Sequence, residues 1–359
     1  MKRYKIIAAL SGLLAVICFF SAASADRTLT LTFTGDVTLG GEEYRQKAED
    51  SFNKTAERKG YDYFFRNFRE MFENDDCTII NLEGVLSDNA RQENRKKTYR
   101  FRGPTDYTKI LTGSSVEGCT IANNHTLDFG EQGYKATAEA LRNANVGCFG
   151  NGLSWIFEKD GLRIGFFGLV SPKFEAYKKF VAEKAAEMRA DGVNAIVVCV
   201  HAGNEYSKIH NRMQENYAKY CIEKAGADLV IMHHPHVLQG ITVMNNRYVC
   251  YSLGNFCFGG NKEVRKGALY SMVVQAEMTF ADDGTYKGQR LKLYPAHMSG
   301  DPEKNNYQPC PVSGKEADEV FERVRFDSKL PLDGILDDDI GCMPLEWLPA
   351  VTEEAEAQQ

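Results

Sequence analysis

The chain has 359 residues, of which 43% are hydrophobic and 26% are charged, and its formal net charge is −6. This is an ordinary globular composition, with enough apolar residues for one large core or two modest ones. The charge balance excludes the basic surface that is typical of nucleic-acid-binding proteins, so no nucleic-acid partner is expected.

The N-terminal segment has the layout of a secretory signal peptide. Basic residues among the first five positions precede the apolar residues 6–20, and Ala-Ser-Ala at 23–25 offers a cleavage site. The apolar run is shorter than the roughly 20 residues that span a membrane. We therefore expect a cleaved leader, residues 1–25, and a secreted or cell-envelope protein. An uncleaved N-terminal anchor is the alternative.

After the leader, short apolar runs rich in β-formers alternate with helical patterns. The runs that predict strands are residues 29–33, 77–81, 119–122, 163–170, 195–200, 228–232 and 248–253. The helical patterns occupy residues 61–73, 133–145, 176–190 and 212–224. Residues 271–280 and 290–294 flank an Asp-Asp-Gly turn and predict a hairpin. Strand–helix alternation predicts an α/β core, to which the hairpin adds antiparallel strands.

The last part of the chain is polar and rich in loop residues. A helical pattern is expected near residues 316–326, and the acidic residues 352–359 predict a disordered tail. The simplest organisation is a leader (1–25), one main domain (26–300) and a C-terminal extension (301–359).

The sequence contains ten cysteines, and nine remain once Cys18 in the leader is removed. Export permits disulfides, and an odd number leaves at least one thiol unpaired within the monomer. Several cysteines lie in or beside apolar runs, so most are expected to be small buried hydrophobic residues. No C-x-x-C pattern is present, which argues against a cysteine zinc site.

Five predicted strands end in residues that bind metals or transfer protons. In chain order these residues are Asp36, Glu83, Asn124 with His125, His201, and His233, His234 and His236. Taken singly, each of these residues could instead have a structural role, as a turn residue or a surface charge. In open α/β sheets, however, sites form beyond the carboxyl ends of the strands. Five of the seven histidines fall at these ends, so together they predict a site.

The candidate ligands are carboxylate and imidazole groups without a thiolate. This set suits Zn²⁺, Mn²⁺ or iron and argues against Ca²⁺. His234 and His236 are two residues apart, so on extended backbone both reach the same face and one metal or two neighbouring ones. Two metals about 3.5–4 Å apart polarise a phosphoryl oxygen and activate a bridging water. His125 is a candidate proton donor because imidazole titrates near neutrality.

At these residues the chain resembles the calcineurin-like metallophosphoesterases and, more closely, the CapA-type proteins of poly-γ-glutamate capsule synthesis. The matching stretches are TGDVTLGG (34–41), NLEG (81–84), FRGP (101–104), ANNHTLDFGEQG (122–133), HAGNEY (201–206), HPHVLQ (234–239) and YSLGNF (251–256). The resemblance covers about residues 29–258. It implies a layered α/β/β/α sandwich, metallophosphoesterase-like, with two divalent transition-metal ions (Mn, Zn or Fe).

The resemblance also implies roles for individual residues. The implied metal ligands are Asp36 and His236 for the first metal, Asn124, His201 and His234 for the second, and Glu83 as the bridge. His125 is the implied acid. Asp128 would orient His125, and a cap for the following helix is the alternative. Glu205, Arg102 and Asn255 are the expected substrate-binding residues.

The chain departs from the phosphoesterase pattern at two of the metal-ligand positions. Thr38 stands where phosphoesterases carry a histidine ligand, and Glu83 replaces their bridging aspartate. CapA-type proteins share both changes. The loss of a histidine should weaken the first metal site, so phosphatase chemistry does not follow from the resemblance.

Three functions remain open from the sequence. The first is an extracytoplasmic component of capsule synthesis that acts with membrane polymer-synthesis proteins. The second is a secreted metal-dependent hydrolase of a phosphoester or amide, and the third is a non-catalytic scaffold. An anionic envelope or capsule polymer would need a locally basic groove on this acidic chain. The candidates for that groove, which alternatively form an exposed loop, are Arg91, Arg95, Lys96, Lys97, Arg100 and Arg102.

Overall fold

A computed structural model describes residues 26–265, 267–328 and 341–349, the last segment through its backbone. The predicted leader (1–25) and acidic tail (352–359) lie outside the described residues. Among the helices of the described part, none is long and apolar enough to cross a membrane.

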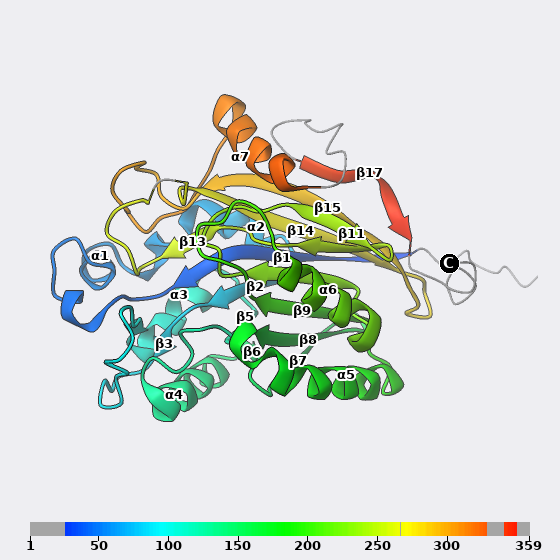
Figure 1. The fold of residues 1–359 in the computed structure, drawn as a ribbon, viewed down its shortest axis with the longest axis horizontal. Coiled ribbons are helices and arrows are strands. Elements are labelled where there is room, and N and C mark those ends of the chain that lie inside the picture. Colours follow the sequence, from blue (N-terminus) through cyan, green and yellow to red (C-terminus); the bar gives the residue numbers. More distant parts are fainter. Residues whose placement is uncertain (1–25, 266, 329–340, 350–359) are drawn as a thin grey trace, which may run out of the picture.

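Two β-sheets dominate the described part of the chain (Figure 1). The first has the strand order β16-β15-β14-β1-β2-β5-β6, with β13 beside β1 and β17 beside β15. Its strands are β1 (Arg27–Thr38), β2 (Cys77–Leu82), β5 (Gly118–Thr120), β6 (Gly147–Phe149), β13 (Asn255–Phe258), β14 (Tyr270–Phe280), β15 (Tyr286–His297), β16 (Cys310–Pro311) and β17 (Gly341–Pro349). Strands β2, β5, β6 and β13 run parallel to β1, whereas β14 is antiparallel to it.

The second sheet has the order β11-β12-β10-β9-β8-β7. Its strands are β7 (Ser154–Lys159), β8 (Leu162–Val170), β9 (Ala195–His201), β10 (Leu229–His233), β11 (Ile241–Met244) and β12 (Arg247–Cys250). Strands β8, β9, β10 and β12 are parallel, and the two edge strands are antiparallel to their neighbours. A small ladder, β3 (Val85–Leu86) with β4 (Arg102–Gly103), stands apart from both sheets.

Helices cover the outer faces of the two packed sheets, which confirms the predicted α/β/β/α sandwich. The first sheet carries α1 (Phe52–Lys59), α2 (Arg69–Glu73), α3 (Thr108–Thr112) and α4 (Gly130–Asn143), and the second carries α5 (Phe174–Ala190) and α6 (Arg212–Ala225). Strand β8 shows how the layers form. Ile164 and Phe166 enter the core between the sheets, while Phe167 and Leu169 pack under the helices, as side-chain alternation along a strand requires.

Helix α7 (Gly314–Asp327) confirms the helical pattern expected near residues 316–326. Its apolar residues Ala317, Val320, Phe321 and Val324 join the core between the sheets. Residues from the expected C-terminal extension therefore complete the main core.

The helix predicted over residues 61–73 is wrong in part. The chain forms 3-10 turns at Tyr61–Tyr63 and Arg66–Phe68, and only Arg69–Glu73 is α-helical. Consecutive Phe64 and Phe65 are both fully buried. The 3-10 turns place both rings in the core cluster that also contains Phe68 and Phe72.

Most described cysteines are buried small residues, as expected. The eight cysteines whose side chains are described are all reduced, six of them buried and two half-buried. Burial raises the pKa of thiols such as Cys77 and Cys119 well above its ordinary value, so these groups stay protonated.

Candidate metal centre

The predicted ligands converge where parallel strands of both sheets end. Strands β1, β2 and β5 of the first sheet lead to Asp36, Glu83 and the Asn124–His125 pair. Strands β9 and β10 of the second sheet lead to His201 and to the histidines at 233–236. Contacts across the sheets close the site, because the Nδ2 of Asn81 (β2) lies 3.2 Å from the Nδ1 of His201 (β9).

Glu83 lies at the centre of this convergence. Its Oε1 is 3.7 Å from His125 Nε2, 3.8 Å from His201 Nε2 and 3.8 Å from His236 Nε2. Both carboxylate oxygens are buried and accept no hydrogen bond within the described residues. Burial raises the pKa of Glu83 well above its ordinary value. A buried carboxylate without a partner is costly, and a cation between it and the imidazoles would remove that cost.

Asp36 is held as a carboxylate by its neighbours. Its Oδ1 accepts from Asn81 Nδ2 at 2.7 Å, and its Oδ2 lies 3.3 Å from His236 Nδ1 and accepts from the His234 amide at 3.3 Å. Burial alone would raise the pKa of Asp36, but His236, His233 and Asn81 lower it below its ordinary value. The group is therefore ionised and ready to bind a cation near neutral pH.

The histidines are oriented by hydrogen bonds at one ring nitrogen. His236 Nδ1 donates to Asn255 Oδ1 at 2.9 Å, which leaves its Nε2 directed at Glu83. The Nε2 of His201 lies 2.9 Å from the amide oxygen of Asn124. Burial lowers the pKa of His201 well below its ordinary value, and a neutral imidazole is the form that binds metals.

The backbone of the His-His-Pro-His turn is strained. His234 has φ 104° and His236 has φ 57°, both in a region that residues with a Cβ rarely adopt. The Nδ1 of His234 is buried without a hydrogen-bond partner among the described residues. Strain of this kind persists where the surrounding structure enforces it, often at functional sites.

Two groups of side chains are close enough to hold an ion. One comprises Glu83, His234 and His236, and the other comprises Asp36, Glu83 and His201, each with ligand atoms within 4.8 Å of one another. Glu83 belongs to both groups, as a bridging ligand must. The His234 ring lies 4.7 Å from the His201 ring and 6.1 Å from the His236 ring, while His236 Nδ1 lies 3.3 Å from Asp36 Oδ2. The oxygen and nitrogen donors fit a divalent transition metal.

His125 is hydrogen-bonded to Asp128, which in turn forms an ion pair with Lys97. Its Nδ1 donates to Asp128 Oδ2 at 2.6 Å, and Asp128 also accepts from the Phe101 amide at 2.8 Å. The ammonium of Lys97 contacts Asp128 Oδ1 and donates to the carbonyl of Asn124 at 2.8 Å. The ring of Phe101 lies over His125, 4.3 Å between centroids. These contacts give Asp128 the orienting role; it makes no cap contact with α4, which starts without a side-chain cap.

Three further residues, Asn81, Asn123 and Lys97, lie at the site although the sequence did not predict this role for them. Asn81 binds both Asp36 and His201, and Asn123 donates to the Leu82 carbonyl at 2.8 Å. Asn81 and Asn123 lie beside predicted ligands at strand ends, and this position in the sequence could have indicated that they belong to the site. Lys97 appeared only as a candidate for a polymer groove, and no local pattern links it to Asp128.

Two expected substrate-binding residues, Arg102 and Asn255, make contacts within the protein. The guanidinium of Arg102 bonds Glu43 Oε2 at 2.7 Å and the Ser87 carbonyl at 2.5 Å, so its charge is already paired. Asn255 is buried behind His236 and positions that ring. Glu205, in contrast, is exposed on the loop after β9.

Thr38 also has a structural role. Its hydroxyl donates to the Glu83 carbonyl at 2.8 Å and so fixes the backbone of that residue. The groove candidates Arg95 and Arg100 are both paired with Glu93, at 3.1 Å and 2.9 Å.

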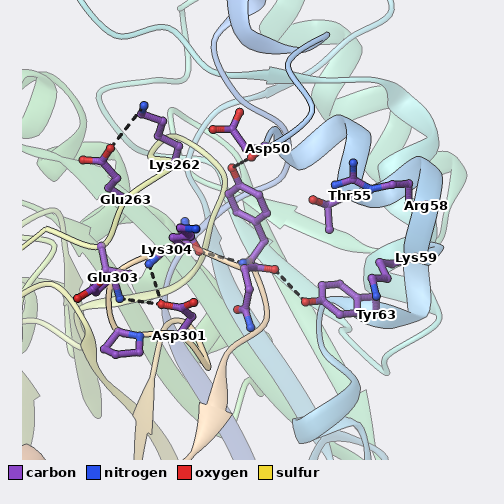
Figure 2. Close-up of a pocket in the computed structure, with 15 residues that line it drawn as sticks. Asp50, Thr55, Arg58, Lys59, Tyr63, Lys262, Glu263, Asp301, Glu303 and Lys304 are labelled. Carbon is purple, nitrogen blue, oxygen red and sulfur yellow. Dashed lines mark hydrogen bonds and ion pairs between the residues drawn. The ribbon is translucent and has the colours of Figure 1, made fainter.

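A separate cleft of about 880 Å³ opens between α1 and the loop at 301–307 (Figure 2). Its charged lining residues are Arg58, Lys59, Lys262 and Lys304 against Asp50, Glu263, Asp301 and Glu303. The opposite charges balance, so the cleft has no preference for an anion. None of the predicted metal ligands lines it.

Comparisons with known proteins agree with the motifs. A family model described as "Bacterial capsule synthesis protein PGA_cap" matches residues 30–260. The PGA biosynthesis protein CapA of Bacillus subtilis (strain 168) is 30% identical over 259 residues, which cover 65% of this chain and 64% of that protein. The capsule biosynthesis protein CapA of Bacillus anthracis is 27% identical over 256 residues, 64% of this chain and 60% of that protein. The match thus spans less than two thirds of either relative.

Solved structures include the calcineurin-like phosphoesterase YfkN from Bacillus subtilis. It is 16% identical, with a TM-score of 0.43, and the match covers 73% of this chain and 88% of that chain. A similarity at this level does not indicate a shared activity.

Proposed function

Because the chain belongs to the bacterial capsule synthesis family PGA_cap, we propose that it acts outside the cytoplasm as a metal-dependent hydrolase of a poly-γ-glutamate envelope polymer. The predicted signal peptide supports the location, and the relatives named for capsule and PGA biosynthesis support the polymer. Membrane proteins that synthesise the polymer are the proposed partners.

The observation that carries the proposal is the environment of Glu83. A fully buried carboxylate accepts no hydrogen bond among the described residues, while three imidazole nitrogens lie 3.7–3.8 Å from one of its oxygens. A protein-only role gives no reason to keep this costly arrangement. The residues that would hold the ions are Asp36, Glu83, Asn124, His201, His234 and His236.

When bound, divalent metal ions would polarise the scissile carbonyl and lower the pKa of a coordinated water. The chain's own residues supply orientation and proton transfer. Asp128 fixes the His125 ring through Nδ1, so that Nε2 faces the ligand cluster and can give a proton to the leaving amine. Phe101 covers the ring and restricts the access of bulk water to it.

The first test is metal content by mass spectrometry on the purified mature chain. About two transition-metal ions per chain are expected, and they should be lost in a His234→Ala/His236→Ala variant. A chain that stays metal-free after reconstitution with Mn²⁺, Zn²⁺ and Fe²⁺ would overturn the catalytic proposal.

The second test follows the polymer. Metal-loaded protein should shorten poly-γ-glutamate, measured by size-exclusion chromatography, and His125→Ala should slow this by about 100-fold or more. If His125→Ala keeps its metal and cleaves at the unchanged rate, the proposed proton donor is wrong.

A further inference from the structure

Arg265 lies between two tyrosines on loops that are distant in sequence. Its Nη1 donates to the Tyr206 hydroxyl at 2.7 Å, and its Nη2 donates to the Tyr99 hydroxyl at 3.2 Å. The guanidinium carbon also lies 5.1 Å from the Tyr206 ring centre and 5.7 Å from the Tyr99 ring centre. Hydrogen bonds and cation–π contacts on both sides fix the plane of the guanidinium.

Both tyrosines belong to loops that contact the metal centre. Tyr206 follows β9 and its ring lies 6.0 Å from the ring of His236. Its amide donates to the Pro235 carbonyl at 2.7 Å, which ties the loop to the His-His-Pro-His turn. Tyr99 stands between Lys97, which contacts Asp128, and Phe101, which covers His125. Arg265 therefore joins the two loops on either side of the centre.

The charge of Arg265 is not neutralised within the described part of the chain. It is exposed and forms no ion pair there, whereas Arg95, Arg100 and Arg102 all pair with glutamates. A guanidinium fixed in orientation, exposed and without a carboxylate partner is preorganised to bind an anion in a bidentate manner.

We propose that Arg265, held by Tyr99 and Tyr206, is the substrate-binding arginine of the centre and pairs with a carboxylate of the γ-linked glutamate polymer. The inference rests on the proposed function, since a γ-linked chain carries a free α-carboxylate on every residue. When Arg265 binds one of these carboxylates, it fixes which amide bond of the polymer lies next to the predicted metal ligands.

The neighbouring cleft does not compete for this role. The loop of Arg265 also lines that cleft through Lys262, Glu263 and Val264 (Figure 2), where Lys262 pairs with Glu263 at 3.4 Å. The basic and acidic side chains of the cleft offset one another, so the cleft attracts an anion less strongly than the unpaired guanidinium of Arg265 does.

The experiment measures binding and not turnover. A fluorescently labelled oligo-γ-glutamate is titrated with the full mature chain in the presence of EDTA, and its anisotropy is followed. Arg265→Gln should weaken binding by about 10- to 100-fold, the loss expected for one charged bidentate contact. Arg265→Lys should recover only part of the loss, because an ammonium lacks the planar fork. Arg323→Gln is the matched control, since Arg323 also lies over a tyrosine, 4.7 Å from the Tyr270 ring centre.

The outcomes separate the inference from the proposed function. Binding that is equally tight in the wild type and Arg265→Gln would overturn the inference and leave the function standing. A wild-type chain that does not bind oligo-γ-glutamate would overturn the polymer role itself. Equal binding of a control oligomer with the same γ-linked backbone, in which every α-carboxylate is converted to a carboxamide, would also overturn the carboxylate assignment. Displacement by inorganic phosphate at concentrations where glutarate has no effect would assign Arg265 to a phosphate instead.

Discussion

The buried carboxylate of Glu83 lowers the stability of the metal-free protein but is proposed to bind metal. A single substitution can separate these two effects. Glu83→Gln keeps the shape of the side chain but removes the buried charge. In EDTA above about pH 9, where His236 is neutral and no longer balances the charge of Glu83, the variant should unfold at the same or a higher urea concentration than the wild type, because no unpaired buried carboxylate remains. With metal present the order should reverse, and metal affinity should fall at least about tenfold.

The control for this substitution is Glu139→Gln, which removes an exposed charge on helix α4. This variant should change neither the urea concentration at which the protein unfolds nor its metal affinity. A Glu83→Gln protein that binds metal as tightly as the wild type would remove Glu83 from the ligand set.

The protonation of His236 predicts how the stability of the metal-free protein depends on pH. Burial alone would lower the pKa of His236, but the carboxylates of Glu83 and Asp36 raise it to about 9. An unfolded imidazole titrates near 6.5. Between these values the folded state holds more protons, so the free energy of unfolding should fall as pH rises from about 6.5 to 9, by roughly 1–3 kcal/mol.

Glu83→Gln also tests the cause of this pH dependence. The variant lacks the carboxylate that contributes most to raising the pKa of His236, so its unfolding free energy should fall less over the same window. Urea denaturation in EDTA at about pH 6.5 and at about pH 9 gives the change of unfolding free energy with pH for each protein. Identical slopes for the two proteins would show that Glu83 does not control His236. Added metal should invert the trend, because imidazole binds metals only when deprotonated.

At the scale of elements, Asp327 at the end of α7 holds the loop that carries Glu205 and Tyr206. Its Oδ2 accepts from the His210 amide at 2.9 Å, from His210 Nδ1 at 2.8 Å and from the Gly240 amide at 2.8 Å. Asp327→Ala should leave these buried donors unpaired and cost about 2–4 kcal/mol of unfolding free energy.

Hydrogen exchange locates the effect of Asp327→Ala. Amides at 203–211 should exchange faster, while those of strand β9 should keep their protection. Asp318→Ala, on the exposed side of the same helix, is the control and should leave exchange unchanged. Uniformly faster exchange over the whole chain would mean that α7 supports the core and not the loop in particular.

The contrast between strand ends and loops explains what the sequence predicted. Asp36, Glu83 and His201 could be brought together from the sequence, because parallel strands end at one edge and apolar runs locate those ends. Lys97 and Arg265 could not, since each lies on a long loop whose path depends on contacts with residues far away in the chain. The contacts of Arg102 with Glu43 and of Asn255 with His236 could not be predicted either, because the motifs place these residues near the site without showing which way their side chains point.

At the scale of the whole molecule, the site depends on how closely the two sheets approach. Contacts between them at the site edge include His201 with Asn81 and Asn124, and His233 Nε2 with the Thr34 carbonyl at 3.1 Å. The strand pattern predicted the sandwich layers but not this spacing, because spacing is set by the sizes of facing side chains.

Gly168 of β8 sets the spacing next to the site. A Cβ there would lie 2.7 Å from Thr120 Oγ1, 2.9 Å from the Gly150 Cα and 3.0 Å from the Ala122 Cβ, all on the opposing sheet side. Gly168 pairs with Cys199, two residues before His201, and Ala122 lies two residues before Asn124. A methyl group at this position would therefore push the ligands of one sheet away from those of the other.

Gly168→Ala should consequently lower metal affinity without altering any ligand. We expect a loss of about 1–3 kcal/mol of unfolding free energy from overpacking, together with roughly tenfold weaker metal binding by competition with a chelator. Gly165→Ala adds the same methyl to the same strand on the opposite face, where it meets the flexible side chains of Ile196 and Met188. That control should lose stability but bind metal as the wild type does. If both variants bind metal normally, the spacing between the sheets does not determine the geometry of the centre, and the ligands must be positioned by their own loops.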